Sequence, residues 1–290
     1  MNKSEIAPHV WQIDSGIPGP TVLVLGGVHG SEKPGVEIVQ RLLGSDLSRI
    51  VERGKLILGI GNPLAVEQNR RFLEGDRDLN RCFALLTEAQ RQTVAGKRAE
   101  VLKLIIARAD VLLDLHATIK PSDPMVLSPN DPTQEPLKSI IPVLGIEKII
   151  TGSGLYKENG DGVTTQCYAH AQGKTGITVE AGWQEDMTLV ARVHKAVLRA
   201  LAVIGVSKPS DEVVEPVQHE YFESYWSVAA TDDFQFVGEW GNFEELPSGT
   251  HFATRDGKKL VTPWDSLMVF QKKPENIVPG DEACQLLRRQ

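Results

Sequence analysis

His29 and Glu32 are the first residues along the chain whose types and spacing could do chemistry. They follow the apolar segment 21–25 and two glycines, and a helical pattern begins near Pro34. A neutral imidazole and a carboxylate can bind one metal ion together, and two such ligands with a third form an open catalytic zinc site. Because this spacing is common by chance, a turn whose histidine caps the next helix remains the alternative for this motif alone.

Two later apolar segments also end in ionisable residues. One ends in His116, and the other ends in Glu180. In open α/β sheets, ligands bind beyond the carboxyl ends of the strands, where loops bring side chains from several elements together. We therefore expect His29, His116 and Glu180 to lie at one edge of a sheet, which favours the metal interpretation of His29.

The order of the apolar segments predicts an α/β fold with a mostly parallel, mixed sheet flanked by helices. Residues 21–25 and 55–60 read as strands, and the amphipathic pattern at 34–44 predicts a helix between them. Strand, helix, strand in this order implies a right-handed crossover between parallel strands. Residues 140–144 and 146–150 are too short to assign.

Other elements are expected along the chain. They are an edge strand at 10–13, one long helix at 87–109, a short helix at 164–172, a second long helix at 187–204 and a glycine-rich mobile loop at 152–162 beside the site. In the helix at 87–109, Val94, Val101, Leu104 and Ile105 are expected to form the inward stripe.

Length and composition are those of an ordinary soluble globular protein. The chain has 290 residues, 41% of them hydrophobic and 24% charged, with a net charge of −7. An acidic chain offers no basic patch for nucleic acid, and no apolar run approaches the roughly 20 residues that span a bilayer. Cys82, Cys167 and Cys284 form no close pair, so we expect neither disulfides nor a cysteine zinc site. The start of the chain lacks an apolar leader, and a cytoplasmic enzyme fits best.

Composition changes near residue 209. Residues 209–290 carry 15 Asp and Glu against 7 Lys and Arg, and 11 of the 17 aromatic residues. Asp256-Gly257 is a hairpin signal within this part. We therefore predict an α/β domain at 1–208 and a small all-β domain or cap at 209–290.

A loop rich in Arg and Asp lies between the strand at 55–60 and the long helix. It contains the pair Arg70-Arg71 and the run Asp78-Leu79-Asn80-Arg81. Such a loop is either a solvated surface turn or a site for an anionic group. The planar guanidinium of arginine suits a carboxylate better than the ammonium of lysine does.

Four motifs now stand in order: His29-Gly30-Ser31-Glu32, Arg71 with Asp78-Leu79-Asn80-Arg81, Asp114-Leu115-His116, and Val179-Glu180-Ala181-Gly182. Together and in this order, they resemble the succinylglutamate desuccinylase/aspartoacylase family, which shares the zinc carboxypeptidase fold. The resemblance covers residues 21–182, and the acidic β-rich tail matches the C-terminal domain of the family in kind.

The resemblance implies a role for each matched residue. It implies one zinc ion per chain held by His29, Glu32 and His116 with water in the fourth position, Glu180 as general base, Arg71 as the cation at the oxyanion, and Asn80 and Arg81 as ligands of a substrate carboxylate. The arginine assignment stays open between Arg70 and Arg71, because the two are adjacent and the segment that follows is slightly longer than in the aspartoacylase pattern.

These roles agree with the chemistry of amide hydrolysis. Zinc lowers the pKa of a bound water towards about 7 and polarises a carbonyl. A carboxylate such as Glu180 can take the proton from that water and return it to the leaving amine. Asp114 shares a strand face with His116 and could orient a zinc-bound imidazole; the alternative is a hydrogen-bonded aspartate at the end of a strand.

The expected substrate is a small molecule with a free carboxylate: an N-acyl amino acid or a related amide. The aspartoacylase branch is expected to carry a Tyr and an Arg shortly before the glutamate motif, but no Arg occurs here between Arg108 and Arg192. N-acetylaspartate is therefore disfavoured, although Lys157 or Lys174 could supply a point charge. The alternatives are a zinc carboxypeptidase acting on peptides and a non-catalytic metal- or ligand-binding protein, and an oligomer remains open.

Overall fold

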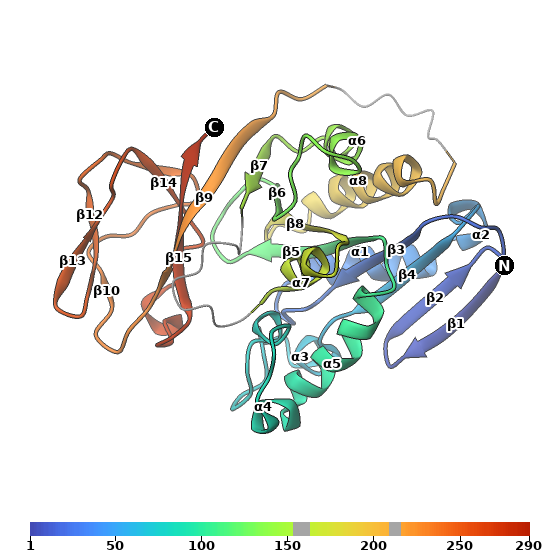
Figure 1. The fold of residues 1–290 in the computed structure, drawn as a ribbon, viewed down its shortest axis with the longest axis horizontal. Helices are drawn as coiled ribbons and strands as arrows, with labels where there is room; N and C mark the ends of the chain where they lie inside the picture. The colour runs from blue at the N-terminus through green and yellow to red at the C-terminus, as the bar shows by residue number, and fades with distance from the viewer. Residues whose placement is uncertain (153–162, 209–215) are drawn as a thin grey trace.

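The computed structural model describes residues 1–152, 163–208 and 216–290. Within these residues one large sheet contains twelve strands, in the order β1-β2-β4-β3-β5-β8-β6-β7-β9-β15-β14-β11 (Figure 1). Their bounds are β1 Asn2–Ala7, β2 Val10–Asp14, β3 Thr21–Gly26, β4 Lys55–Ile60, β5 Val111–Thr118, β6 Met125–Ser128, β7 Lys148–Thr151, β8 Thr175–Trp183, β9 Glu220–Ala229, β11 Glu244–Leu246, β14 Ser266–Val269 and β15 Glu282–Arg289.

The centre of the sheet is parallel and its margins are antiparallel. β3 pairs in parallel with both β4 and β5, and β5 pairs in parallel with β8. β6 pairs with β8 in antiparallel orientation, and so does β9 with β15. The predicted α/β fold with a mixed, mostly parallel sheet is confirmed for the part that carries the site motifs.

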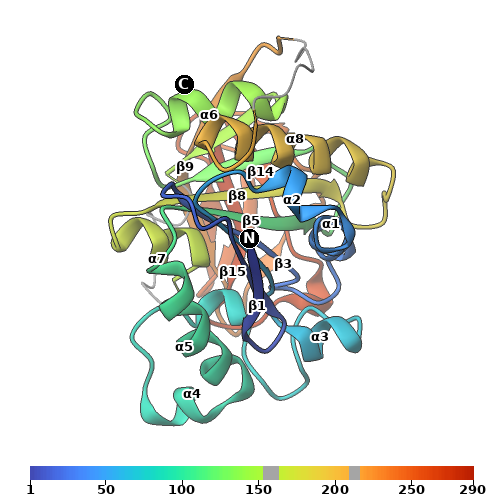
Figure 2. The same ribbon diagram turned by 90° about the vertical axis from the view of Figure 1, so that its right-hand side faces the viewer.

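Helices cover both faces of this parallel centre (Figure 2). One layer consists of α1 (Lys33–Gly44), α6 (Leu137–Leu144) and α8 (Leu189–Ile204), whose apolar side chains pack with those of Val24, Leu113 and Val179. The opposite layer contains α5 (Val94–Ile106) and α7 (Thr165–Ala171), which pack over Leu23 and Leu112. Because strand side chains alternate between faces, His116 lies on the same face as Leu112.

The helix expected at 87–109 is two helices, so this prediction is wrong. α4 (Glu88–Gln92) ends at Thr93, whose backbone is extended and whose side chain caps α5 by accepting from the Gly96 amide. The expected inward stripe is also wrong in part, because the side chains of Val94 and Leu104 are exposed. The buried stripe of α5 uses small residues, Ala95, Gly96 and Ala99, with Leu102, Ile105 and Ile106. Apolar periodicity alone missed the cap at Thr93.

The strand expected at the edge, β2, is an inner strand. It pairs with β4 on one side and with β1 on the other. β1 escaped prediction because Asn2–Ala7 is mainly polar and exposed, without the alternation of a half-buried strand. The structure assigns the two segments that were too short to assign from the sequence. Residues 140–144 belong to α6, and residues 148–150 of the segment at 146–150 belong to β7.

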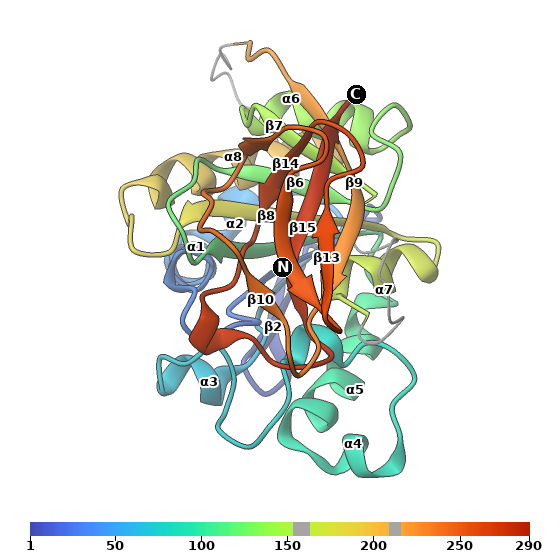
Figure 3. The ribbon, with the colours of Figure 1, turned by 90° about the vertical axis from the view of Figure 1, so that its left-hand side faces the viewer.

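The C-terminal residues are rich in β-structure, as expected (Figure 3). β9, β15, β14 and β11 continue the large sheet, while β10 (Gln235–Phe236), β12 (His251–Arg255) and β13 (Lys258–Val261) form a second, three-stranded sheet. Asp256 and Gly257 both have positive φ and connect β12 to β13, which confirms the predicted hairpin.

Three of the expected features fall on or beside residues that the structure does not describe. The glycine-rich loop and Lys157 lie within or beside 153–162, and the predicted domain boundary adjoins 209–215. β7 pairs with β9, so the hydrogen bonding of the sheet passes directly from the first part of the chain to the second. Among the helices that are described, none has the length and hydropathy needed to cross a membrane.

Candidate metal centre and active-site pocket

Three neighbouring parallel strands bring the site residues to one edge. His116 and Glu180 are register partners near the carboxyl ends of β5 and β8. His29 and Glu32 lie in the connection that leads from β3 to α1. The expected meeting of these four residues is therefore found, and its cause is the shared polarity of β3, β5 and β8.

The connection after β3 needs glycine at two positions. Gly27 has φ of +67°, a conformation that side chains with a Cβ rarely adopt. At Gly30 a Cβ atom would lie 2.0 Å from the backbone of Ala65 in α3 (Pro63–Glu67). The loop is thereby pressed against α3 and turned so that His29 and Glu32 face β5. His29 does not cap α1, because Glu32 occupies the N-cap position and both ring nitrogens of His29 have other partners.

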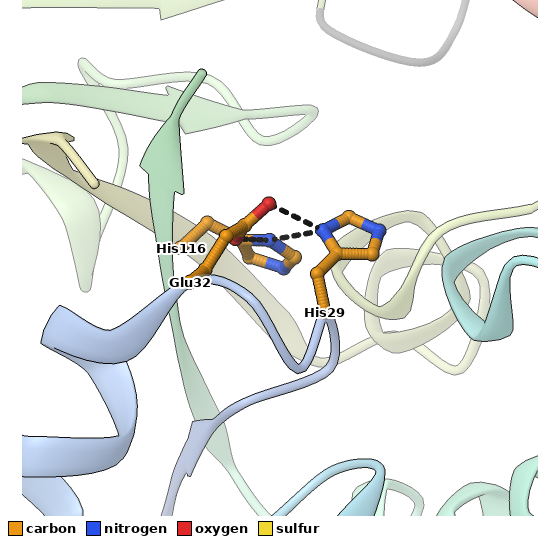
Figure 4. Close-up of side chains that lie close together, drawn as sticks. All are labelled: His29, Glu32 and His116. Atoms are coloured by element: carbon orange, nitrogen blue, oxygen red, sulfur yellow. Dashed lines mark hydrogen bonds and ion pairs between the residues drawn. The ribbon is translucent and has the colours of Figure 1, made fainter. Parts of the chain in front are cut away.

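His29, Glu32 and His116 converge on one point (Figure 4). The Nδ1 atom of His29 lies 2.7 Å from Glu32 Oε1, and Nδ1 of His116 lies 2.9 Å from Glu32 Oε2. The two Nδ1 atoms are 3.2 Å apart. All three side chains are buried, and one ligand atom from each lies within 4.8 Å of the others.

The outward nitrogens of both rings face aspartates. Nε2 of His29 lies 2.9 Å from Asp78 Oδ1, and Nε2 of His116 lies 3.0 Å from Asp114 Oδ2. With a cation between the two Nδ1 atoms, each Nε2 would carry the ring proton and donate it to its aspartate, which would leave the Nδ1 lone pair for the cation. Asp114 therefore orients the imidazole of His116, and Asp78 does the same for His29.

The cluster fits a divalent cation. Two Nδ1 atoms and the Glu32 carboxylate face one another, an arrangement that positive charge stabilises, whether it comes from a cation or, without one, from ring protons. Burial opposes ionisation of Glu32, but the two imidazoles outweigh it and hold the pKa of Glu32 well below its usual range. Likewise, burial would lower the pKa of His116, but Asp114 and Glu32 raise it well above the usual range. Two nitrogens and one carboxylate are a donor set of catalytic zinc sites, and other divalent ions accept it too.

Glu180 lines the same pocket as the three residues of the cluster. Its side chain is buried, and its Oε2 atom has no hydrogen-bond partner in the described part of the chain. Burial, with help from the Glu32 charge and against the nearby His116, raises the pKa of Glu180 to about 8. A carboxyl group with such a pKa can both accept and return a proton near neutral pH.

The two adjacent arginines have different surroundings. Nη1 of Arg71 lies 3.2 Å from Glu32 Oε1, and its Nη2 lies 3.3 Å from Asp78 Oδ2. Arg70 points into solvent and pairs with Glu74 at 2.8 Å. The geometry favours Arg71 as the cation of the site.

A pocket of about 120 Å³ opens over the cluster and Glu180. Asn80 and Arg81 line it; Nη1 of Arg81 donates to the Asn80 carbonyl at 3.0 Å. Its remaining wall comes largely from segments without a sequence motif: Ile119, Lys120, Leu127, Gln166, Thr178, Asn242, Phe270, Gln271, Lys272, Glu282 and Gln285.

The sequence pointed to some of these residues less well than to the ligands. Asp78 stands in the same motif as Asn80. This motif lies between the two histidine motifs in the sequence, which could have indicated that its carboxylate pairs with a histidine. Gln166 and the C-terminal residues of the pocket had no such signal, because only the fold brings them to the site. His170 and Lys174 do not line the pocket.

Comparison with known proteins shows the family to which the chain belongs. Residues 18–204 match the family described as the succinylglutamate desuccinylase/aspartoacylase catalytic domain. The chain belongs to this family. A succinylglutamate desuccinylase of Erwinia tasmaniensis is 26% identical over 261 residues, which cover 83% of this chain and 75% of that protein.

Two other curated relatives match over a shorter stretch. A succinylglutamate desuccinylase of Pseudomonas putida is 32% identical over 36% of this chain, and a probable aspartoacylase of Nostoc is 31% identical over 33% of it. These alignments span about a third of each relative, 32% and 35% of their lengths. Both branches of the family are thus represented among the relatives.

Solved structures share the fold over nearly the whole chain. The succinylglutamate desuccinylase of Vibrio cholerae superposes with a TM-score of 0.80 at 18% identity, covering 97% of this chain and 85% of that one. The product-bound ectoine utilization protein EutE (DoeB) of Ruegeria pomeroyi gives a TM-score of 0.69 at 18% identity, covering 96% and 88%. The expected likeness to this family's fold is confirmed.

Proposed function

We propose that the protein is a zinc-dependent hydrolase that cleaves the amide bond of an N-acyl amino acid or a related amide with a free carboxylate. The observation that carries this proposal is the convergence of His29, Glu32 and His116 beside Glu180, one carboxyl oxygen of which has no partner among the described residues. Membership in a family with desuccinylases and aspartoacylases supports the reaction class.

His29, Glu32 and His116 would hold one zinc ion per chain. When bound, zinc supplies a Lewis acid that activates water and polarises the scissile carbonyl. Asp78 and Asp114 keep the two imidazoles in the tautomer that presents Nδ1.

Glu180 moves the proton of the reaction. Its carboxylate takes the proton of the attacking water and delivers it to the leaving amine. Arg71 stabilises the negative charge that develops on the carbonyl oxygen. Asn80 and Arg81 bind the carboxylate of the substrate through N–H groups of their side chains. The guanidinium of Arg81 supplies the positive charge.

The C-terminal residues favour a small substrate over a peptide. Asn242, Phe270, Gln271 and Lys272 close one side of the pocket, so little room remains for a chain that continues beyond the scissile amide. We propose that residues 209–290 act as a cap that narrows the site, whereas a peptidase needs an open groove.

Amine release from a panel of N-acyl amino acids and short peptides tests the proposal. The zinc-loaded protein should cleave at least one acyl amino acid, and a chelated sample of the same protein should cleave none. Cleavage of peptides alone would make the protein a carboxypeptidase. Zinc binding without cleavage of any compound would favour the non-catalytic alternative.

A further inference from the structure

Gln166 belongs to the part of the pocket lining that β6, β8 and α7 contribute, namely Leu127, Gln166, Thr178 and Glu180; we call this part the floor. Gln166 lies in α7, which approaches β8 closely at Gly176, where a Cβ atom would lie 2.4 Å from the Gln166 backbone carbonyl oxygen. The hydroxyl of Thr178 donates to Oε1 of Gln166 at 2.6 Å. Both the backbone and the side chain of Gln166 are therefore held against β8.

This arrangement leaves the amide nitrogen of Gln166 for a ligand. The residue is 4% exposed and lines the pocket, yet Nε2 has no hydrogen-bond partner among the residues that the structure describes. Asn80 is arranged in the same way, because its Oδ1 accepts from the Thr165 amide at 3.0 Å and its Nδ2 is likewise unpartnered within those residues. Both nitrogens belong to residues that line the pocket, so each can donate a hydrogen bond to an acceptor on a bound substrate.

The charges around the floor indicate which acceptor fits. Leu127 and Thr178 are cross-strand partners on β6 and β8, and Gln166 completes the floor from α7. The one charged pocket residue on these three elements is Glu180. The cations of the pocket, Arg71, Arg81, Lys120 and Lys272, come from other segments. A carboxylate placed against Gln166 would receive a neutral N–H donor and no balancing cation from the floor elements, whereas a neutral acceptor needs no such balance.

We infer that Gln166 is a specificity-determining residue that selects substrates with a neutral hydrogen-bond acceptor, such as a carboxamide or hydroxyl, over those with a second carboxylate. The inference rests on the proposed function and narrows its substrate class. It assigns the free carboxylate of the substrate to Asn80 and Arg81, and the neutral group to Gln166.

This inference can be tested with two pairs of compounds. Each pair consists of an amide and the corresponding acid. They are N-acetylglutamine with N-acetylglutamate, and N-acetylasparagine with N-acetylaspartate. The zinc-loaded wild type should prefer the amide member of a pair by about tenfold or more in kcat/KM, mainly through KM, as expected for one buried hydrogen bond to a group that needs no balancing cation. Gln166→Met, which keeps the length of the side chain but has no donor, should lose most of that preference.

Gln172→Met is the matched control, because Gln172 is exposed at the end of the same helix and lies outside the pocket. This variant should keep the wild-type preference. Zinc content of Gln166→Met equal to that of the wild type would show that the site is intact. A wild-type preference for the acid members, or an unchanged preference in Gln166→Met, would overturn the inference.

Calorimetric titration of the same four compounds separates this inference from the proposed function. If the zinc-loaded wild type cleaves none of them, the proposed reaction is in doubt, but stronger binding of the amides, lost in Gln166→Met, would still support the role of Gln166. Equal binding, stronger binding of the acids, or no binding would overturn that role.

Discussion

The metal side and the floor of the pocket differ in how their polar groups are satisfied. On the metal side, all four imidazole nitrogens face carboxylates: Glu32 serves both rings from within, and Asp78 and Asp114 serve them from outside. On the floor, Gln166 has its oxygen fixed while its nitrogen lacks a partner in the described residues. Under the proposed function the comparison separates two tasks: the metal side would be organised before substrate arrives, and the floor would keep its donors for the substrate.

The two regions also differ in the charge they tolerate. The metal side concentrates three carboxylates that need a cation to balance them, and Arg71 supplies part of that balance through Glu32 and Asp78. The floor is neutral apart from Glu180. Substitutions on the metal side should therefore change metal binding and turnover, whereas substitutions on the floor should change the choice of substrate.

The largest effect is expected for Glu32→Gln, which removes the carboxylate that both imidazoles share. Because a bound metal supplies several kcal/mol of transition-state stabilisation, turnover should fall by roughly a thousandfold or more. Zinc content, measured by atomic absorption, should fall with it. Glu37→Gln, on the exposed side of α1, is the control and should keep both. Full zinc content in Glu32→Gln would remove Glu32 from the ligand set.

Arg71 and its neighbour form a natural pair for the next test. Loss of the guanidinium in Arg71→Ala should lower kcat by about 10²–10³-fold, the range seen when an oxyanion donor is removed. Arg70→Ala breaks an exposed ion pair with Glu74 and should leave kcat nearly unchanged. Steady-state kinetics of both variants decide the assignment; a larger loss in Arg70→Ala would reverse it.

A smaller effect is expected outside the ligand set. Asp114→Asn removes the carboxylate that fixes the proton on Nε2 of His116, so zinc affinity should fall by about 10–100-fold. Competition with a chelator of known affinity measures this change. Asp110→Asn, at the exposed start of the same segment, serves as control. If both variants bound zinc as the wild type does, the hydrogen bond to His116 would have no part in holding the metal.

The metal-free protein should show the cost of burying Glu180. Its pKa is raised from 4.5 to about 8, so the unfolded state releases this proton at a lower pH than the folded state. The contribution of Glu180 to the free energy of unfolding therefore falls as pH rises from about 4.5 to about 8. Urea denaturation should find that Glu180→Gln gains stability over the wild type, by a few kcal/mol at most, across this window. A difference that does not change with pH would contradict the shifted pKa.

The sequence predicted the metal side better than the floor for a physical reason. His116 and Glu180 lie near the carboxyl ends of β5 and β8, and His29 and Glu32 follow β3. The apolar runs of these strands can be recognised in the sequence, and parallel strands present their carboxyl ends at one edge. The meeting of these four residues at one sheet edge could therefore be predicted from local sequence patterns.

Elsewhere the geometry depends on packing between segments far apart in the chain. Gln166 reaches the pocket because α7 lies against Gly176, and Lys272 reaches it because β14 and β15 extend the large sheet. Neither contact has a local pattern. The break of the helix at Thr93 was missed for the opposite reason, since a local cap interrupted an apolar period that otherwise continued.

Glu180→Gln provides the most direct test of the central claim, that Glu180 moves protons beside a metal held by His29, Glu32 and His116. Zinc content and turnover of an acyl amino acid cleaved by the wild type should be measured on the same preparation. We expect one zinc ion per chain, as in the wild type, and a loss of about 10²–10⁴-fold in kcat, the usual contribution of a general base. A variant that keeps its zinc and turns over at nearly the wild-type rate would contradict the account.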